Sequence, residues 1–336
     1  MTIRPRSRLS LLRRMPPGII LPLRMPDAHH WIVRDDDSAP VGDVAVRLLR
    51  ARLDTVWSEL SSACAVLDAM AGVPSGNTEH VHQLRVATRR TLAAFDAFRT
   101  VIPAKRRSWF VKRLIRLRRV AGEARDLDVL TARLSLQESS AVRARQRLVS
   151  MLSKQRSRSR DPIRKLRESL LEDDWPGHVE RLLERVAGRR RQPSFGRYAR
   201  SRFKPLVEEF FAAADHKLRD ADGMHALRVQ GKKLRYGLEI FAAVLPAKHV
   251  AKCRQSLEQM QHTLGEFTDH SAAADRFARW ARSADAGPSR DELTRLCRDE
   301  HSLANDARKS FSKWWSQDRR RSLRRRFQRV LKRRSA

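Results

Sequence analysis

Apolar residues recur at helical spacing along most of the chain, and this pattern predicts an all-α protein. In residues 43–70 an apolar residue stands at every third or fourth position from Val46 to Leu67, and Asp43 precedes them as a capping residue. The 13 glycines and 14 prolines are too few for a sheet with many turns. Further helices are expected at 78–102, 103–122, 124–152, 195–220, 223–245, 247–264, 267–283 and 289–315.

Glycine, proline and polar runs predict where these helices end. Gly122 and Gly265 are expected to allow tight turns between helices. The run 153–160, SKQRSRSR, has no apolar residue and is interpreted as a linker or basic loop, after which Asp161 and Pro162 begin another helix. Residues 188–196 form a second break. The arm 1–42 carries six prolines and is expected to be irregular.

One nine-residue motif occurs twice, 143 residues apart. It reads HQLRVATRR from His82 and HALRVQGKK from His225. The same offset relates Gly122-Glu123 to Gly265-Glu266 and Asp126 to Asp269. A constant offset over this distance indicates an internal duplication. Two such copies are expected to pack about a pseudo-twofold axis, with their equivalent faces together or in line.

Each motif helix is expected to carry two stripes. Positions i, i+3 and i+7 share one helix face, so a histidine leads a row of cations in both copies. The first row is His82, Arg85 and Arg89, and the second is His225, Arg228, Lys232 and Arg235. The neighbouring apolar rows are Leu84, Phe95, Phe98 and Ile102, and Leu227, Leu238, Phe241 and Leu245.

Charge restricts the class of partner. A net charge of +33 and a pI near 11.5 require anionic partners, which means polyphosphate, nucleic acid or an acidic membrane surface. The tail 316–336 is strongly basic, and its residues 319–334 include ten Lys or Arg. In isolation this tail is expected to be disordered by self-repulsion and to form an amphipathic helix on a polyanion. Asp35, Asp36 and Asp37 form an acidic island, interpreted as a local counter-charge.

The two motifs resemble the CHAD family, the conserved histidine α-helical domain. The resemblance rests on HxLRVxxRR and HxLRVxxKKLRYxLE, each followed by IP or LP and a Gly-Glu-x-x-Asp element, and spans about residues 43–315. It implies two pseudo-symmetric four-helix-bundle units around a basic central groove or pore. The first repeat would be about 43–152 and the second about 195–315, with a basic linker and a helix between them. Leu92 departs from the family pattern, which usually has Arg there, so the two halves are expected to bind unequally.

The resemblance also implies non-enzymatic binding of inorganic polyphosphate. Guanidinium forks would bond phosphate oxygens in pairs, and lysines would act as point charges. Tyr236 is expected to pack against the cation row, and Glu239 to orient Arg235. The expected polyphosphate-binding residues are His82, Arg85, Arg89, Arg90, Arg125, His225, Arg228, Lys232, Lys233, Arg235 and Tyr236.

Catalysis and metal binding are the weaker interpretations of the same residues. His82 and His225 have no nucleophile positioned by the sequence, and a helix-anchoring hydrogen bond with a donor to phosphate is favoured for both. His80 and His82 face apart on a helix, which argues against a shared metal. Asp126 and Asp128 form a DxD pattern, for which a salt bridge to Arg125 or to neighbouring arginines near a helix start is favoured over a metal. No GxxxxGK, HExxH or ExExK signature is present, so neither a cofactor nor an enzyme activity is expected.

The resulting hypothesis is a cytoplasmic polyphosphate-binding protein associated with polyphosphate granules. No apolar run is long enough to span a bilayer, and Cys64, Cys253 and Cys297 are too scattered for a disulfide framework. The alternative is a protein that binds the nucleic-acid backbone through the stripes or the tail. It is weakened by an aromatic content of 6%, with Trp314-Trp315 as the sole exposed-looking pair for base stacking.

Overall fold

The computed structural model describes residues 37–69, 79–136, 142–189, 191–215 and 221–332. Within these ranges the chain forms ten α-helices and no β-strand, which confirms the all-α prediction. The helices are α1 (Val41–Ala69), α2 (Glu79–Ala97), α3 (Ala104–Leu136), α4 (Val142–Glu172), α5 (Trp175–Ala187), α6 (Phe195–Asp215), α7 (Ala221–Phe241), α8 (Ala247–Arg282), α9 (Arg290–Trp314) and α10 (Gln317–Leu331), with short 3₁₀ segments at Ala242–Val244 and Ala284–Ser289.

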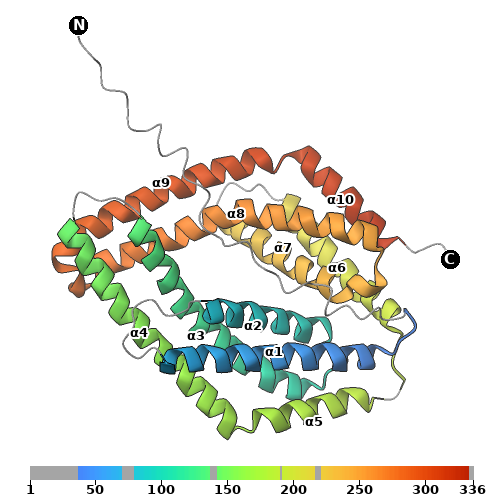
Figure 1. Ribbon diagram of the computed structural model, residues 1–336. Coiled ribbons are helices and arrows are strands. Elements are labelled where there is room, and N and C mark those ends of the chain that lie inside the picture. Colours follow the sequence, from blue (N-terminus) through green and yellow to red (C-terminus); the bar gives the residue numbers. More distant parts are fainter. Residues whose placement is uncertain (1–36, 70–78, 137–141, 190, 216–220, 333–336) are drawn as a thin grey trace. The chain divides into compact units, whose positions relative to one another are not determined.

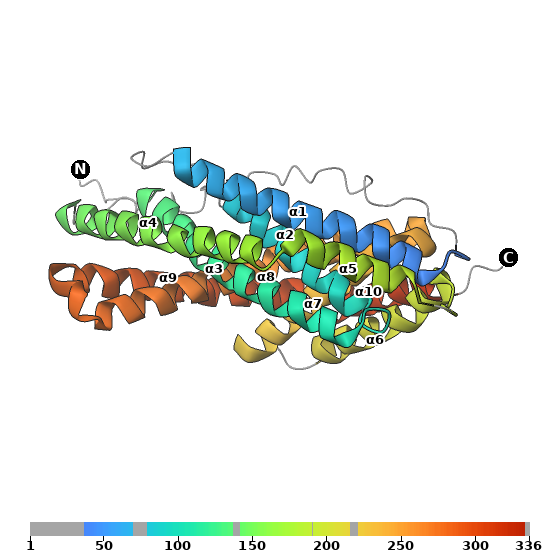
Figure 2. The ribbon, with the colours of Figure 1, turned by 90° about the horizontal axis from the view of Figure 1, so that it is seen from below.

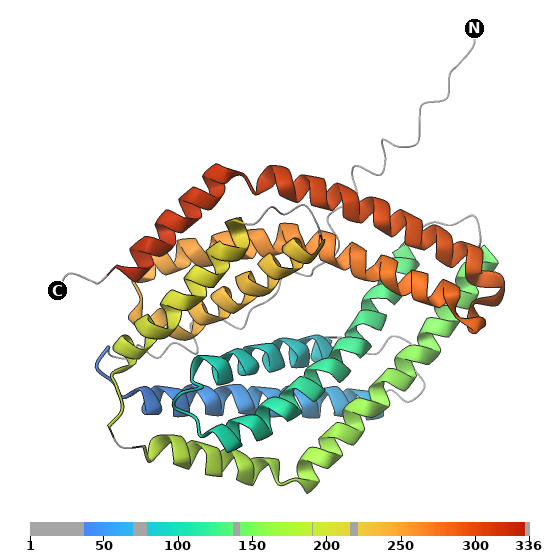
Figure 3. The ribbon, with the colours of Figure 1, turned by 180° about the vertical axis from the view of Figure 1, so that it is seen from behind.

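Helices α1–α5 pack mainly on one another, and so do α6–α10 (Figure 1). Helix α1 contacts both α2 and α5, and Figure 2 shows α1 and α5 side by side. Helices α8 and α9 form the most extensive helix pair, and they run next to each other in Figure 3. Contacts between α2 and α7, and between α1 and α6, join the two sets. The two motif helices are therefore neighbours.

A continuous apolar core extends through both sets of helices. The apolar rows predicted for the motif helices are buried throughout, from Leu84 and Phe95 to Leu227 and Phe241. Phe98, at the end of α2, stacks on Tyr198 of α6 with ring centroids 6.1 Å apart and meets Phe241 of α7 edge-on at 6.4 Å. These aromatic contacts fix α2 against the second set, so the cationic face beside the apolar row has a defined direction.

The beginning of α1 is tied to the beginning of α6. Val41 N donates to Pro193 O at 3.1 Å, and Phe195 N donates to Ala39 O at 2.7 Å. Arg200 pairs with Asp37 at 3.2 Å, so this member of the acidic island does act as a local counter-charge. Residues 1–36 and the other two aspartates of the island lie outside the described residues.

The predicted turns at Gly122 and Gly265 are wrong. Both glycines lie inside long helices, α3 with 33 residues and α8 with 36. A Cβ atom at either position would meet nothing within 4 Å, so no close approach requires glycine there. The cost of about 1 kcal/mol for glycine within a helix is smaller than the gain from packing the helix on both sides of it. The predicted break at 188–196 does fall between α5 and α6, although α6 already begins at Phe195.

The predicted linker at 153–160 is also wrong, because these residues lie in the middle of α4. Leu152 and Ile163 are both fully buried on either side of the polar run. Between them, Arg156 donates from Nε to Asp128 Oδ1 of α3 at 2.7 Å, with 13% and 4% of these side chains exposed. An ion pair thus takes the place of an apolar contact, which hides the helical pattern. Pro162 is inside α4 and does not begin a helix.

The basic tail is a helix of the core. Helix α10 packs on α6 and α8. Phe327 is fully buried and contacts the rings of Phe203 and Phe211 of α6 at 6.3 and 6.0 Å between centroids. Ser316 is the N-cap of α10, and its side chain accepts a hydrogen bond from Arg319 N at 3.3 Å. The prediction of a tail that is disordered until it meets a polyanion is therefore wrong for residues 317–331, because their apolar stripe has a partner within the chain.

Candidate anion-binding site

The contact between α2 and α7 brings cations of the two motifs together. Arg85 and Arg89 come from α2, and Arg228 and Lys232 come from α7. These four residues are called the cation cluster below. Each is half-buried, and the positive charges are close enough that those of Arg85 and Arg89 act on Lys232, and that of Arg85 acts on Arg228. The two predicted stripes therefore face a common region.

Burial and mutual repulsion lower the pKa of three members of the cation cluster, Arg89, Arg228 and Lys232. Burial, followed by the charges of Arg228, Arg89 and Arg85, lowers the pKa of Lys232 to about 7. Burial, followed by the charge of Arg85, lowers the pKa of Arg89 to about 10. Burial also lowers the pKa of Arg228. The folded chain thus holds positive charge where water solvates it poorly, an arrangement that favours an anion as partner.

Two aspartates border the cation cluster in equivalent positions. Arg85 Nη1 donates to Asp126 Oδ1 of α3 at 3.2 Å, and Arg228 Nη2 lies 3.6 Å from Asp269 Oδ1 of α8. Asp126 also faces Arg276 at 3.7 Å. The arginines and the aspartates are each separated by the 143-residue offset of the sequence repeat. These aspartates hold one side of each guanidinium group while about half of the carboxylate side chain remains exposed.

Arg90 and Arg235 belong to a different arrangement, around Glu239. Arg235 Nη1 donates to Glu239 Oε1 at 2.6 Å, which confirms the predicted i, i+4 pair. Arg90 Nε lies 3.5 Å from Glu239 Oε2 across the α2–α7 contact. Arg235 also donates to Gln261 Oε1 at 3.0 Å and lies 4.6 Å from the centre of the Tyr236 ring. Tyr236 therefore does pack against a cation, and Arg90 and Arg235 already have an anionic partner.

The two histidines differ in their surroundings. His82 is half-buried, and burial together with Arg125, Arg85 and Arg89 lowers its pKa. It is therefore neutral at pH 7 and can donate one N–H without adding charge. His225 and Lys233 are exposed on α7. Leu92, at the position of the missing arginine, packs partly buried against the core.

A family model, that of the CHAD domain, matches residues 60–278. This range contains both motifs, the cation cluster and both bordering aspartates. The chain belongs to the CHAD family. The family is generally a non-catalytic binding domain, and no enzyme family matches the chain.

Solved structures agree with this CHAD fold. The chain is similar to the CHAD domain from the plant Ricinus communis, with 20% identity, a TM-score of 0.63, and 83% of this chain and 93% of that chain covered. It is also similar to PptA from Streptomyces chartreusis, with 17% identity, a TM-score of 0.56, and 82% and 99% covered. No curated protein matches the chain. At these identities the structural likeness concerns the fold alone.

Within the described residues of this CHAD domain, no group of three or more His, Cys, Asp or Glu side chains is arranged to hold a metal ion. Asp126 and Asp128 are instead paired with arginines, as the sequence favoured. The arginines are Arg85, Arg276 and Arg156, and the aspartates lie within α3 and not near a helix start. His80 Nδ1 lies 3.3 Å from Glu59 of α1. Across the described helices, none is long and apolar enough to cross a membrane.

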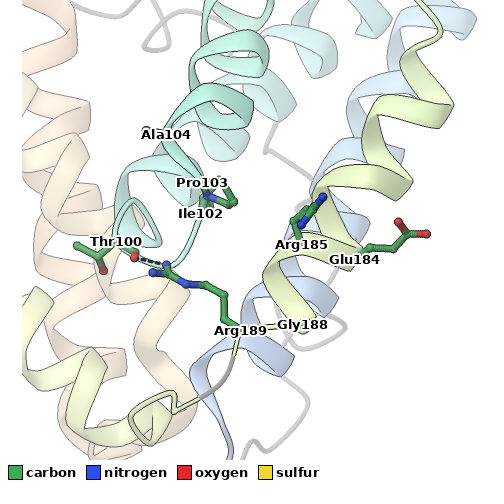
Figure 4. A pocket seen from close by; sticks show the side chains of 8 residues that line it. All are labelled: Thr100, Ile102, Pro103, Ala104, Glu184, Arg185, Gly188 and Arg189. Atoms are coloured by element: carbon green, nitrogen blue, oxygen red, sulfur yellow. Dashed lines mark hydrogen bonds between the residues drawn. The ribbon is translucent and has the colours of Figure 1, made fainter.

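Two pockets lie away from the cation cluster of this CHAD domain. The first is between the α2–α3 turn and the end of α5, where Arg189 donates to Thr100 O at 2.6 Å (Figure 4). None of the predicted site residues lines it. The second is lined by basic residues of α8 and α10. Its residues form no single motif in the sequence, because Lys248 lies within the predicted second repeat, 195–315, and Arg325, Arg326 and Arg329 lie in the basic tail, 316–336.

Proposed function

We propose that this chain binds inorganic polyphosphate at the cation cluster between α2 and α7, without catalysing a reaction. The observation that carries the proposal is the burial of four cations from two helices within range of one another, with the pKa of Lys232 lowered to about 7. Binding of polyphosphate is a known role of CHAD domains. A linear polyphosphate carries a negative charge on every unit, so neighbouring units would meet neighbouring cations.

The chemistry of binding would be charge-assisted hydrogen bonding. Arg85, Arg89 and Arg228 offer planar forks that can bond two phosphate oxygens at once, and Lys232 offers a point charge. Asp126 and Asp269 would keep Arg85 and Arg228 oriented. Bringing a polyanion into the cluster would remove the repulsion among the cations and release counterions, which makes affinity depend strongly on salt.

The remaining predicted residues would have supporting roles. His82, neutral at pH 7, would donate an N–H to a phosphate oxygen, and Arg125 lies close enough to His82 to lower the pKa of its ring. His225 and Lys233 are exposed beyond the cluster on α7 and would meet the continuing chain. Arg90 would act mainly by holding α2 against α7 through Glu239, which Arg235 orients while it packs on the Tyr236 ring. In a cell, such binding would place the protein on polyphosphate granules.

Nucleic acid is the competing ligand. Single-stranded nucleic acid is usually bound by exposed aromatic rings on which bases stack. Trp315 is buried, and Trp314 stacks on it with ring centroids 5.8 Å apart. The pair that looked exposed in the sequence is therefore part of the packed core. The remaining alternative is binding to the phosphate backbone of duplex DNA, which an experiment must distinguish from binding to polyphosphate.

The test compares long-chain polyphosphate with duplex DNA of equal charge at physiological salt. The cluster variant carries Arg85→Ala, Arg89→Ala, Arg228→Ala and Lys232→Ala. The control variant carries Arg279→Ala, Arg282→Ala, Arg298→Ala and Lys313→Ala, which removes the same charge from exposed positions of α8 and α9. Circular dichroism and a melting curve establish that each variant is folded.

The wild type is expected to bind polyphosphate at least tenfold more tightly than DNA. The cluster variant should lose that preference, and the control variant should keep it. Equal weakening in both variants would mean that net charge alone determines binding, and the proposed site would be rejected. Tighter binding to DNA than to polyphosphate would support the competing function.

A further inference from the structure

A second basic surface lies where the beginning of α8 meets α10. It forms a pocket of about 610 Å³. Six basic side chains line it, three from each helix: Lys248, His249 and Lys252, and Arg325, Arg326 and Arg329. No carboxylate is among the residues that line this pocket. It is composed entirely of residues outside the cation cluster.

The fold forces these cations together. Helix α10 is held by its buried apolar face, Leu323, Phe327 and Val330, so its arginine-rich face must point to the start of α8. No acidic residue lies in the first turn of α8, where the helix dipole adds positive potential to that of the lysines. Like charges in such a position cost stability unless an anion lies between them. Apolar packing thus maintains an unfavourable electrostatic arrangement.

The side chains remain available for a ligand. Lys248, Lys252, Arg325 and Arg329 are exposed. Arg326 is anchored from below, since its Nη1 donates to Ser256 Oγ at 2.7 Å. The pocket therefore combines one guanidinium group that is held in place, that of Arg326, with exposed cations from both α8 and α10.

We propose that this pocket is a second anion-binding site, which takes a short run of linked phosphates. Tetrahedral phosphate oxygens match the guanidinium forks of α10, and a run of linked charges can reach the lysines of α8 as well. No Phe, Tyr or Trp lines the pocket, so it lacks the large aromatic rings on which nucleic-acid bases most often stack. This proposal rests on the proposed function, polyphosphate binding. Its residues are separate from the cation cluster, so an experiment can reject one of the two sites and leave the other standing.

The experiment titrates tripolyphosphate into the full chain by calorimetry. The pocket variant carries Lys248→Gln, Lys252→Gln, Arg325→Gln and Arg329→Gln, all at exposed positions. Its control carries Arg279→Gln, Arg282→Gln, Arg298→Gln and Lys313→Gln, which changes the net charge equally. Both are compared with the wild type and with the cluster variant.

The pocket variant is expected to bind one tripolyphosphate fewer per chain, or to bind it at least tenfold more weakly, and the control variant to match the wild type. In the cluster variant the remaining tripolyphosphate site should persist. If the cluster variant is unfolded, the comparison of the pocket variant with its control still decides whether the pocket binds tripolyphosphate. Equal titrations for the pocket variant and the control would overturn the proposal. A pocket variant that loses only duplex DNA binding would overturn it too.

Discussion

Arg90 of α2 and Glu239 of α7 form an ion pair across the contact between the two motif helices, 3.5 Å apart and each with 14% of its side chain exposed. The second oxygen of Glu239 accepts a hydrogen bond from Arg235. Its charge also acts on the half-buried Arg52 of α1. One carboxylate thus neutralises cations from three helices, whereas Asp126 and Asp269, which border the cation cluster, are 47% and 58% exposed.

Glu239→Gln should therefore destabilise the protein strongly. The change removes a negative charge that half-buried guanidinium groups share, and we expect the free energy of unfolding to fall by roughly 2–4 kcal/mol. Urea unfolding measures this loss. The control is Glu258→Gln, which removes an exposed carboxylate paired with Arg254 and should cost less than about 0.5 kcal/mol. Similar losses for the two changes would contradict a central role for Glu239.

Polyphosphate affinity should fall as pH rises above 7. Lys232 has a pKa of about 7 in the free protein, and a bound anion would raise it, so binding takes up a proton in this range. The affinity is fully present below pH 7 and decreases above it. Between pH 7 and pH 9 we expect a loss of roughly tenfold, equivalent to one pKa unit. Calorimetry at constant ionic strength measures it.

The control for this pH dependence is Lys232→Arg, which stays charged throughout the range and should give a flatter profile. Lys232→Met tests the same charge through stability. Because the folded pKa is depressed from 10.5 to about 7, the unfolded chain binds more protons between these values, and the stability contributed by Lys232 rises with pH there. Without ligand, the methionine variant should therefore be more stable than the wild type at pH 7. Identical pH profiles for wild type and Lys232→Arg would exclude Lys232 as the titrating group.

Phe327→Ala should lower the denaturant concentration at which the protein unfolds, although it leaves the positive charge of α10 unchanged. Phe327 is fully buried between α10 and α6, and its truncation is expected to cost roughly 3–5 kcal/mol. Chemical unfolding with a fluorescence readout measures this cost. Arg321→Ala, at an exposed position of the same helix, is the control. A truncation before α10 is for the same reason a poor test of binding by the tail.

Asp128→Asn should alter stability and not metal affinity. Burial raises the pKa of Asp128 in spite of its bond to Arg156, which indicates a poorly solvated pair. Loss of the carboxylate removes the charge that faces Arg156 in this poorly solvated place, and we expect a cost of roughly 1–3 kcal/mol. The melting temperature of the wild type should be the same with and without a chelator. A drop on chelation that Asp128→Asn abolishes would instead establish a metal site.

The local features of the motif helices could be predicted from the sequence because their two faces are chemically distinct. Leu84 and Leu227 mark apolar rows that are buried, and Arg85 and Arg228 mark rows that stay near the surface. The juxtaposition of α2 and α7 followed only from the repeat and the expected pseudo-symmetry. That Arg90 is drawn to Glu239, 149 positions further along the chain, could not be predicted without the fold.

The errors arise where tertiary contacts override local signals. In α4, Arg156 occupies a position where an apolar residue would be expected, because Asp128 of α3 pairs with it. The local sequence gives no sign of a partner on another helix. Gly122 and Gly265 are tolerated because the helices around them are packed. The basic C-terminal segment is ordered because α6 and α8 supply an apolar surface for Phe327. In each case the deciding partner lies on another helix.

The half-buried cations at the α2–α7 contact also connect the lifetime of the protein to its surroundings. A ligand that binds only the folded chain stabilises it in proportion to the logarithm of its concentration. A chain that lacks its counter-ion opens more often, and proteases in a cell remove open chains. Under the proposed function, a cell depleted of polyphosphate would degrade this protein faster, so that its abundance would follow the amount of the polymer to which it binds.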